Sequence, residues 1–599
     1  MNRKERRAAA KHGKLTPIAG DTGPPPEDLL AEARRYYQQG LLTQAKELCN
    51  RILARAEQHV PALNLLGVIA QATGRHKLAV KILTRAIASD ALNAACHYNI
   101  ATSYLALDQR ERAAHHFTSA IALGMSEKNI EDFILQNPVI ASCVERIETK
   151  WPLPVKTETL FGPTEVETIA NDVFLRCALE SVVIRGIGLE MFLTHLRAAL
   201  LQFAHEHVSQ PETSVLALLC TVARQCFINE YIYVQTDEET QRARRLLDLL
   251  LQKIANGAAI PPLLVAATAA YRPLHTIAEA RALLGRDWPS AMAELLRQQI
   301  REPLEEAQDH DAIPALTAIE DATSLRVMQQ YEENPYPRWS MNPITTPISE
   351  REPASAGEDI LIAGCGSGQH ALQVAQWFPS ARVLAVDVSR PSLAYARRKT
   401  REQKLRNIDY AQADILKLDT LDRSFDRIEA VGVLHHLTEP ETGWRVLLNL
   451  LRPGGIMRIG LYSEHARRSI MEARGLIAER GYRATAEDIR RCRQEVLREA
   501  DKRDWAPLIA TADFYSMSGC RDLLFNVMEH RFTIPRIKAF LDAHRLTFLG
   551  FELEPDVVGQ FQKRFPSAGA LTSLDDWHAF EADNPLTFRY MYLFTARKT

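Results

Sequence analysis

The chain has 599 residues, of which 46% are hydrophobic and 24% charged, a balance typical of soluble globular proteins with about three or four domains. Its net charge of −2 creates no overall basic field, which argues against general attraction to nucleic acid or anionic lipid. The most apolar stretch, SVLALLCTVARQCFI, is interrupted by Arg224 and Gln225 and is shorter than the roughly 18 residues of a membrane span. We expect a buried helix there and no membrane partner.

The first 14 residues contain six lysines and arginines and one glutamate, and no apolar segment of a secretory signal follows them. With the linker GDTGPPPED, this composition predicts a disordered basic tail over residues 1–25, and contact with RNA or a membrane surface is the alternative. Nine cysteines lack both Cys-x-x-Cys spacing and a histidine cluster. They favour a reducing, cytoplasmic location and predict neither a metal site nor disulfide bonds.

A repeat begins near residue 30, in which turn residues and small residues recur every 34 positions. Its columns are Gly40/Gly74/Asp108, Ala33/Gly67/Ala101, Ala45/Ala79/Ala113 and Ile52/Ala86/Ala120. Small residues let the two helices of a hairpin approach closely, and the turn residue joins them. Residues 26–127 therefore resemble three tetratricopeptide repeats (TPR), although the family's Trp position carries Leu29, Leu63 and His97. The alternative is a helical bundle with chance periodicity.

The resemblance implies a protein or peptide partner, because stacked repeats of this kind form a concave groove. Residues 128–325 continue with apolar residues at helical spacing, as in LEMFLTHLRAALLQFAHEH, and contain no motif that indicates chemistry. We interpret them as a helical connector region or as a partner-binding continuation of the solenoid.

A glycine-rich segment, ILIAGCGSGQHA, begins at Ile360 with the apolar run of a buried parallel strand. Gly364, Gly366 and Gly368 permit a tight turn and a close approach of the backbone to a ligand, and HALQVAQWF continues with helical spacing. A dinucleotide fingerprint has its third glycine one position later, where Gln369 stands. The segment therefore predicts a nucleotide-like ligand but departs from the dinucleotide fingerprint.

Further strands and helices alternate in the order that an open doubly wound α/β sheet requires. ARVLAVDVS predicts a second strand that ends at Asp387, 21 residues after Gly366. A carboxylate at that strand end can accept both ribose hydroxyls. IDYAQADIL places Asp414 at the exit of a third strand, and SFDRIEAVGVLHHL is a fourth. LLRPGGIMRIGLYS predicts a helix, a turn and a fifth strand, and LTFLGFEL and TFRYMYLFTARK are the expected sixth and seventh.

Residues 359–465 resemble a class I S-adenosylmethionine (SAM)-dependent methyltransferase, because GCGSG, VDVS, QADI, GVLHHL and LRPGG occur in that family's order and spacing. The resemblance implies a seven-stranded Rossmann-like domain over residues 326–599 with SAM as its cofactor. The whole chain is similar to bacterial tetratricopeptide proteins that carry such a domain at the C-terminus.

The resemblance assigns the glycines to the amino-acid end of SAM, Asp387 to the ribose, and Asp414 with Ile415 to the adenine. The expected cofactor-binding residues are Gly364, Cys365, Gly366, Gly368, Gln369, Asp387, Val388, Asp414, Ile415 and Gly432. The alternative for both aspartates is a surface cap at a strand end.

One departure from the family concerns Ile362, which stands where the family has an acidic residue two positions before the first glycine. Either Gln369 or His370 takes over part of the methionine end, or binding of SAM is weaker.

SAM is already activated, so a methyltransferase mainly aligns an acceptor behind the methyl group and needs a base only for a weak nucleophile. His435 and His436 follow the fourth strand and Tyr462 ends the fifth, which makes these three the candidates for catalysis, with Glu464 as a rival. Capping and packing are the alternative for the histidines.

A long insertion at about 467–533 is expected to form the acceptor lid. ENPYP is interpreted as a rigid extended turn, from which Tyr336 and Trp339 either cover the site or only pack.

The sequence thus predicts a cytoplasmic methyltransferase acting on a protein or small-molecule acceptor, with repeats that recruit a partner. Two other functions stay open. One is a non-catalytic scaffold with a SAM-binding domain, which Ile362 favours, and the other is a nucleic-acid methyltransferase that uses the basic tail and the arginine-rich insertion.

Overall fold

The computed structural model describes residues 24–150, 160–208, 213–333, 335, 338–339 and 357–599. The expected tail therefore lies almost entirely outside the described residues, and so does Tyr336. The chain divides into two compact units, Met1–Ala120 and Ile121–Thr599.

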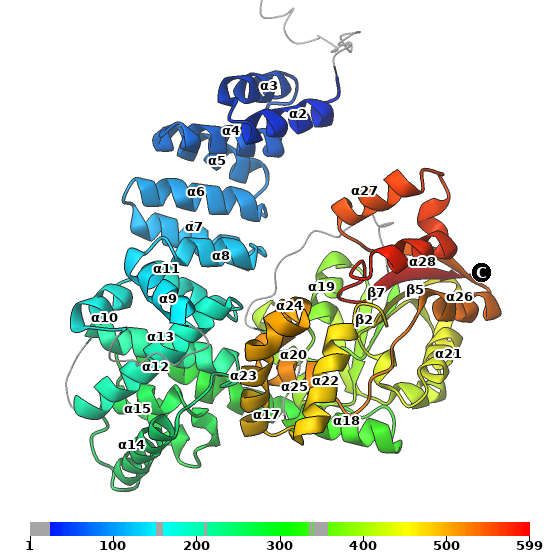
Figure 1. Ribbon diagram of the computed structural model, residues 1–599. Coiled ribbons are helices and arrows are strands. Elements are labelled where there is room, and N and C mark those ends of the chain that lie inside the picture. Colours follow the sequence, from blue (N-terminus) through cyan, green and yellow to red (C-terminus); the bar gives the residue numbers. More distant parts are fainter. Residues whose placement is uncertain (1–23, 151–159, 209–212, 334, 336–337, 340–356) are drawn as a thin grey trace, which may run out of the picture. The chain divides into compact units, whose positions relative to one another are not determined.

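The first unit consists of helical hairpins that repeat at the interval found in the sequence (Figure 1). The first helices of the hairpins start 34 residues apart and are α2 (Pro26–Gln38), α4 (Val60–Ala72) and α6 (Ala94–Ala106). The second helices keep the same interval and are α3 (Leu42–Arg55), α5 (His76–Ser89) and α7 (Arg110–Ala122). The N-terminal region is therefore helical, as expected.

The repeated columns have the positions that close helix packing requires. Gly40, Gly74 and Asp108 turn the chain with φ angles of 75°, 70° and 55°. A side chain at Gly67 would place its Cβ 2.7 Å from the Leu83 side chain, so the helices of this hairpin touch at that point. The small residues thus set the distance between paired helices, and the assignment to the tetratricopeptide family still rests on the sequence pattern.

The second unit begins with helices and continues into a sheet. The helices are α8 (Glu127–Ile134), α9 (Pro138–Lys150), α10 (Pro163–Ala170), α11 (Val173–Ser181), α12 (Ile187–Glu206), α13 (Thr213–Ile228), α14 (Asp237–Ala255), α15 (Pro262–Ala269), α16 (Ser290–Leu296), α17 (Glu302–Ala312) and α18 (Ala322–Glu333). The stretch that contains Arg224 and Gln225 is α13, and in the described part of the chain no helix has the length and apolar character of a membrane span.

The sheet has seven strands in the order β3-β2-β1-β4-β5-β7-β6. The strands are β1 (Asp359–Ala363), β2 (Arg382–Asp387), β3 (Ile408–Gln412), β4 (Phe425–Val431), β5 (Leu451–Leu461), β6 (Leu546–Phe551) and β7 (Tyr592–Lys598). β7 runs antiparallel to both of its neighbours, and the other pairs are parallel. The expected seven-stranded α/β sheet is confirmed, as a mixed sheet.

Helices cover both faces of the sheet and bury its central strands. They are α19 (Gln369–Trp377), α20 (Arg390–Glu402), α21 (Pro440–Leu450), α26 (Ile534–Ala543), α27 (Pro555–Arg564) and α28 (Leu574–Asp583). Along β1, Ile360 and Ile362 pack into the core with α19 and α20, whereas Leu361 and Ala363 pack on the other face with α21 and α26. The strand order changes direction between β1 and β4, and ligands of open α/β sheets bind at such a point.

The segment between β5 and α26 is helical and comprises α22 (Arg468–Arg480), α23 (Ala486–Arg503), α24 (Ala506–Ile509) and α25 (Met517–Phe525). A buried ion pair ties it to the preceding helical region, because both terminal nitrogens of Arg493 contact the Glu190 carboxylate, at 2.9 and 2.8 Å. The helices after residue 121, the insertion and the sheet therefore belong to one compact unit.

Candidate active site

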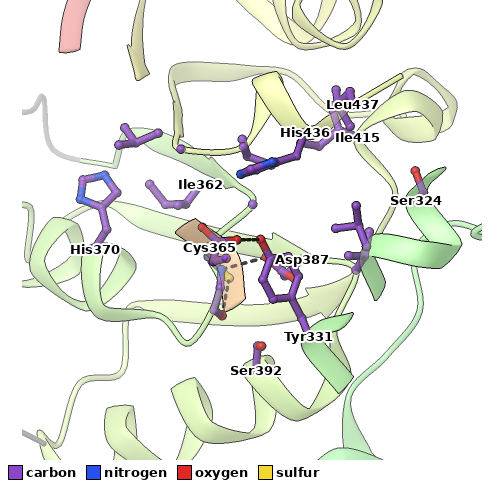
Figure 2. Close-up of a pocket in the computed structure, with 18 of the residues that line it drawn as sticks. Ser324, Tyr331, Ile362, Cys365, His370, Asp387, Ser392, Ile415, His436 and Leu437 are labelled. Carbon is purple, nitrogen blue, oxygen red and sulfur yellow. Dashed lines mark hydrogen bonds between the residues drawn. The ribbon is translucent and has the colours of Figure 1, made fainter. Parts of the chain in front are cut away.

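A cavity of about 260 Å³ opens where β1, β2 and β4 end, beside the point at which the strand order reverses (Figure 2). The expected site residues that line it are Gly364, Cys365, Gly366, Gln369, Asp387, Val388, Asp414, Ile415, Gly432, His436 and Tyr462. Gly368 and His435 are not among its lining residues. The strand ends thus bring most of the predicted residues to one place.

The glycine loop has a conformation that larger residues would not tolerate. Gly364 has φ 73°, and a Cβ there would overlap the Val433 side chain. Gly368, with φ 84°, caps α19, and its Cβ would overlap Ala396. Gly368 therefore supports the loop from behind, while Gly364 and Gly366 present their backbone to the cavity.

Asp387 is held by backbone amides. Its Oδ2 accepts a hydrogen bond from Gly366 N at 2.8 Å, and Oδ1 accepts one from Ser389 N at 2.9 Å. Burial raises the pKa of this carboxyl, while the backbone hydrogen bonds lower it. Because a carboxylate can accept about four hydrogen bonds, Asp387 retains capacity for two ribose hydroxyls.

Asp414 carries a buried oxygen that lacks a partner. The residue is 1% exposed; its Oδ1 accepts a hydrogen bond from Leu416 N at 3.0 Å, and Oδ2 has no partner among the described residues. An unsatisfied buried acceptor costs about 1–3 kcal/mol, so a donor from a ligand would be stabilising there. An adenine amino group beside Ile415 supplies such a donor, and the site fits SAM.

The two predicted histidines have different surroundings. His436 Nδ1 lies 2.7 Å from the Met528 carbonyl oxygen and must donate to it, which leaves Nε2 as an acceptor with no partner among the described residues. His435 is fully buried, and neither of its ring nitrogens has a partner in the described chain. Burial and the neighbouring cations hold the pKa of His435 well below its usual value. Of these two histidines, only His436 lines the cavity.

Tyr462 is fixed between two side chains. Its ring centroid lies 3.8 Å from that of His435, and the Arg467 guanidinium carbon lies 3.8 Å from the same centroid. Burial raises the pKa of Tyr462 well above its usual value, so its hydroxyl stays protonated. Tyr462 can therefore orient an acceptor, but it cannot serve as a base near neutral pH.

Sequence reasoning missed four of the side chains that complete the cavity. Tyr331 of α18 donates a hydrogen bond to Asp522 Oδ1 of α25 at 2.6 Å, and both residues line the cavity with Val327 and Met591. Figure 2 places Tyr331 beside Asp387, across the cavity from His436. No local motif marks these residues: Val327, Tyr331 and Asp522 stand on helices outside the sheet, and Met591 stands directly before β7.

The acidic residue that the chain lacks at Ile362 has a counterpart on the neighbouring strand. Glu429 of β4 is the register partner of Ile362, and its Oε2 lies 2.7 Å from His370 Nε2 and 3.2 Å from Arg458 Nη1. Burial would raise the pKa of Glu429, but the hydrogen bond to His370 and the charges of His370 and the arginines lower it to about 2. His370 lines the cavity and Glu429 fixes its ring.

Trp339 supports the loop from outside the cavity. Its indole nitrogen donates to the Ser367 carbonyl and hydroxyl oxygens, both at 3.1 Å. It does not line the cavity and packs against the loop, in agreement with the packing alternative.

In the described chain no group of His, Cys, Asp or Glu is arranged to hold a metal ion.

Comparison with known proteins agrees with this geometry. Residues 360–455 match the sequence model of a methyltransferase domain family. The methyltransferase GfsG of Streptomyces halstedii is 35% identical over 117 residues, which are 19% of this chain and 42% of GfsG. An uncharacterized protein of a Synechococcus species is 28% identical over 260 residues, 39% of this chain and 61% of that protein. The chain thus spans about half the length of these relatives.

Among solved structures, PKMT2 from Rickettsia typhi in complex with AdoHcy has a TM-score of 0.31 at 18% identity, over 46% of this chain and 52% of that chain. The family match covers the segment from β1 to the start of β5, which contributes the glycine loop, Asp387, Asp414 and His436 to the cavity. The C-terminal part of the chain is therefore a class I SAM-dependent methyltransferase domain, and SAM is its cofactor.

Proposed function

We propose that the protein transfers the methyl group of SAM to an acceptor bound in the same cavity, and that its helical repeats bring a partner protein to this domain. The observation that carries the first part is the unpartnered Oδ2 of Asp414, in the cavity that the glycine loop also lines. Bound SAM would supply an electrophilic methyl group. The remaining wall, with His436, Tyr462 and Asp522, then faces the acceptor.

The residues of this wall have separate tasks. The Nδ1 hydrogen bond orients His436 so that Nε2 can take a proton from the acceptor. The protonated Tyr462 hydroxyl can hydrogen-bond to the acceptor. His435 holds the Tyr462 ring and positions it, and it does not act as the base.

Titration calorimetry with S-adenosylhomocysteine tests cofactor binding. Ligand at about 100 times its dissociation constant should stabilise the protein by about 2.7 kcal/mol. Asp414→Ala should weaken binding about tenfold or more, because a hydrogen bond to a charged group contributes about 1.5–3 kcal/mol. The matched control is Asp409→Ala, an exposed carboxylate on the preceding strand. If the wild type binds neither SAM nor S-adenosylhomocysteine, the scaffold function replaces the one proposed.

The scaffold alternative loses its main sequence argument if Glu429 compensates for Ile362. Glu429 stands opposite Ile362 and reaches the cavity through His370. Transfer of label from methyl-tritiated SAM to a lysate, followed by mass spectrometry of the products, would distinguish enzyme from scaffold.

The nucleic-acid alternative relies on arginines of the insertion that already have acidic partners. Arg467 contacts Glu529, Arg480 contacts Glu495, and the buried Arg493 contacts Glu190. Few of their charges remain for phosphates. Salt-dependent binding of RNA or DNA would favour this alternative.

Recruitment by the repeats is the second part of the proposal, and the 34-residue hairpin period supports it. A chain that begins at Gly124, after α7, should keep its SAM affinity and lose a partner protein captured by the full chain. Loss of SAM affinity in the shortened chain would show that the two units are not independent.

A further inference from the structure

The acceptor side of the cavity is acidic. Among its described lining residues none is Lys or Arg, whereas Asp387, Asp414 and Asp522 carry carboxylates. Asp387 and Asp414 lie at the strand ends that form the cofactor side, which leaves Asp522 of α25 for the acceptor. A negatively charged acceptor would find no cationic side chain there to compensate its charge.

Asp522 is placed to hold a cation. It is 2% exposed, and its Oδ1 accepts hydrogen bonds from Tyr331 at 2.6 Å and from Asn526 Nδ2 at 2.7 Å. These two donors fix the carboxylate, while Oδ2 has no hydrogen-bond partner among the described residues. A buried carboxylate with one oxygen facing a cavity is favourable only if a donor or a positive charge meets it.

The arginines near Asp522 act on its charge only from a distance. Arg467 and Arg474 both contact the nearly buried carboxylate of Glu529. Neither forms an ion pair with Asp522 or lines the cavity. Among the described lining residues no cation contacts the Asp522 carboxylate, so a positive charge in direct contact with it inside the cavity would come from a ligand.

The wall also contains a group that can remove a proton. His436, whose Nδ1 donates to the Met528 carbonyl oxygen, lines the cavity together with the apolar side chains of Val433, Leu437 and Met591. An ammonium group must lose a proton before its nitrogen can attack a methyl group. A carboxylate that binds the ammonium form and an imidazole that accepts its proton are the two groups such an acceptor needs.

We propose that the acceptor is an aliphatic amine, which Asp522 binds as an ammonium ion and His436 deprotonates; this inference rests on the function proposed above. The proton moves to His436 Nε2, and the nitrogen lone pair forms the new bond to the methyl carbon. The carbon–sulfur bond of SAM breaks and its electron pair stays on sulfur. The products are the methylated amine and S-adenosylhomocysteine.

The test uses three probes of equal length on the full chain saturated with S-adenosylhomocysteine: n-butylammonium, n-butanol and butyrate. Calorimetry should show the tightest binding for butylammonium and the weakest for butyrate. Asp522→Asn should weaken butylammonium about tenfold or more, because a charge-assisted hydrogen bond is lost, and should leave butanol unchanged. The Asn side chain keeps an acceptor oxygen for Tyr331.

Glu487→Gln is the matched control, since it removes an exposed carboxylate from the same insertion. The affinity of each variant for S-adenosylhomocysteine shows whether the protein is folded and its cofactor site intact. If the wild type itself does not bind S-adenosylhomocysteine, the result refutes the proposed function and does not test the amine acceptor. If butanol or butyrate binds more tightly than butylammonium, the proposal of an amine acceptor is wrong. The amine is equally overturned if butylammonium does not bind, or binds Asp522→Asn as tightly as wild type.

Discussion

The cofactor wall and the proposed acceptor wall of the cavity are built in different ways. The cofactor wall comes from three consecutive strand ends between residues 360 and 415, and each contributes its residues next to a strand. The acceptor wall brings together Tyr331 and Asp522, which are 191 positions apart and meet in a hydrogen bond of 2.6 Å. One wall is therefore fixed by local sequence, and the other by how helices outside the sheet pack.

The largest effect should follow from Asp387→Ala, which removes the carboxylate expected to accept two ribose hydroxyls. Two hydrogen bonds to a charged group correspond to a loss of about 100-fold or more in SAM affinity. Calorimetry with SAM measures it, and the melting temperature without ligand serves as the folding control. If the variant binds SAM as tightly as wild type, the ribose binds elsewhere, and the division into a cofactor wall and an acceptor wall is wrong.

A change on the opposite wall should have the reverse pattern. His436→Gln removes the nitrogen assigned to proton transfer, so single-turnover methyl transfer should slow by about 100-fold or more. SAM affinity should stay within about twofold, because the proposal assigns His436 to the acceptor and not to the cofactor. Transfer that slows less than about fivefold would indicate a packing role for His436.

The difference between the walls also explains what the sequence could predict. Gly364, Asp387 and Asp414 were predictable because each follows a buried strand, and parallel strands end at one edge of a sheet. Asp522 has no such signature. It lies within a helix of the insertion and meets Tyr331 of α18 in a hydrogen bond at the cavity.

Two expectations needed the three-dimensional arrangement to be resolved. His435 and His436 are adjacent in the sequence, yet the Met528 carbonyl orients one ring at the cavity and Tyr462 covers the other. Around LRPGG, the expected turn is part of β5, where the pairing with β4 shifts register between Phe425 and Arg427. Gly454 accommodates this irregularity with φ 76°.

A smaller effect concerns Glu429, which lies within β4 and belongs to none of the motifs at the strand ends. Its pKa lies at about 2 in the folded protein, below its usual 4.5, so the pairing stabilises the fold above about pH 4.5. This contribution is lost as the pH falls toward about 2. In Glu429→Gln the free energy of unfolding should change less steeply over this range than in wild type.

Chemical denaturation at several pH values measures that slope, with Asp409→Asn as the control for loss of an exposed carboxylate. The same variant tests the link to the cavity, because His370 would lose the carboxylate that fixes its ring. SAM affinity should fall modestly. An unchanged slope together with unchanged affinity would show that Ile362 needs no compensation.

The smallest effect should come from behind the cofactor wall. Trp339→Phe removes the indole hydrogen bonds to the Ser367 carbonyl and hydroxyl oxygens but keeps an aromatic ring against Tyr395. A neutral hydrogen bond contributes about 0.5–1.5 kcal/mol, so SAM affinity should weaken between about twofold and tenfold. Because Trp339 supports the loop from behind and does not line the cavity, methyl transfer at saturating SAM should stay at the wild-type rate, which single-turnover kinetics would show. A slower rate at saturation would mean that the glycine loop also positions the methyl group. The cofactor wall and the acceptor wall would then depend on the same supporting residues, although they come from different parts of the sequence.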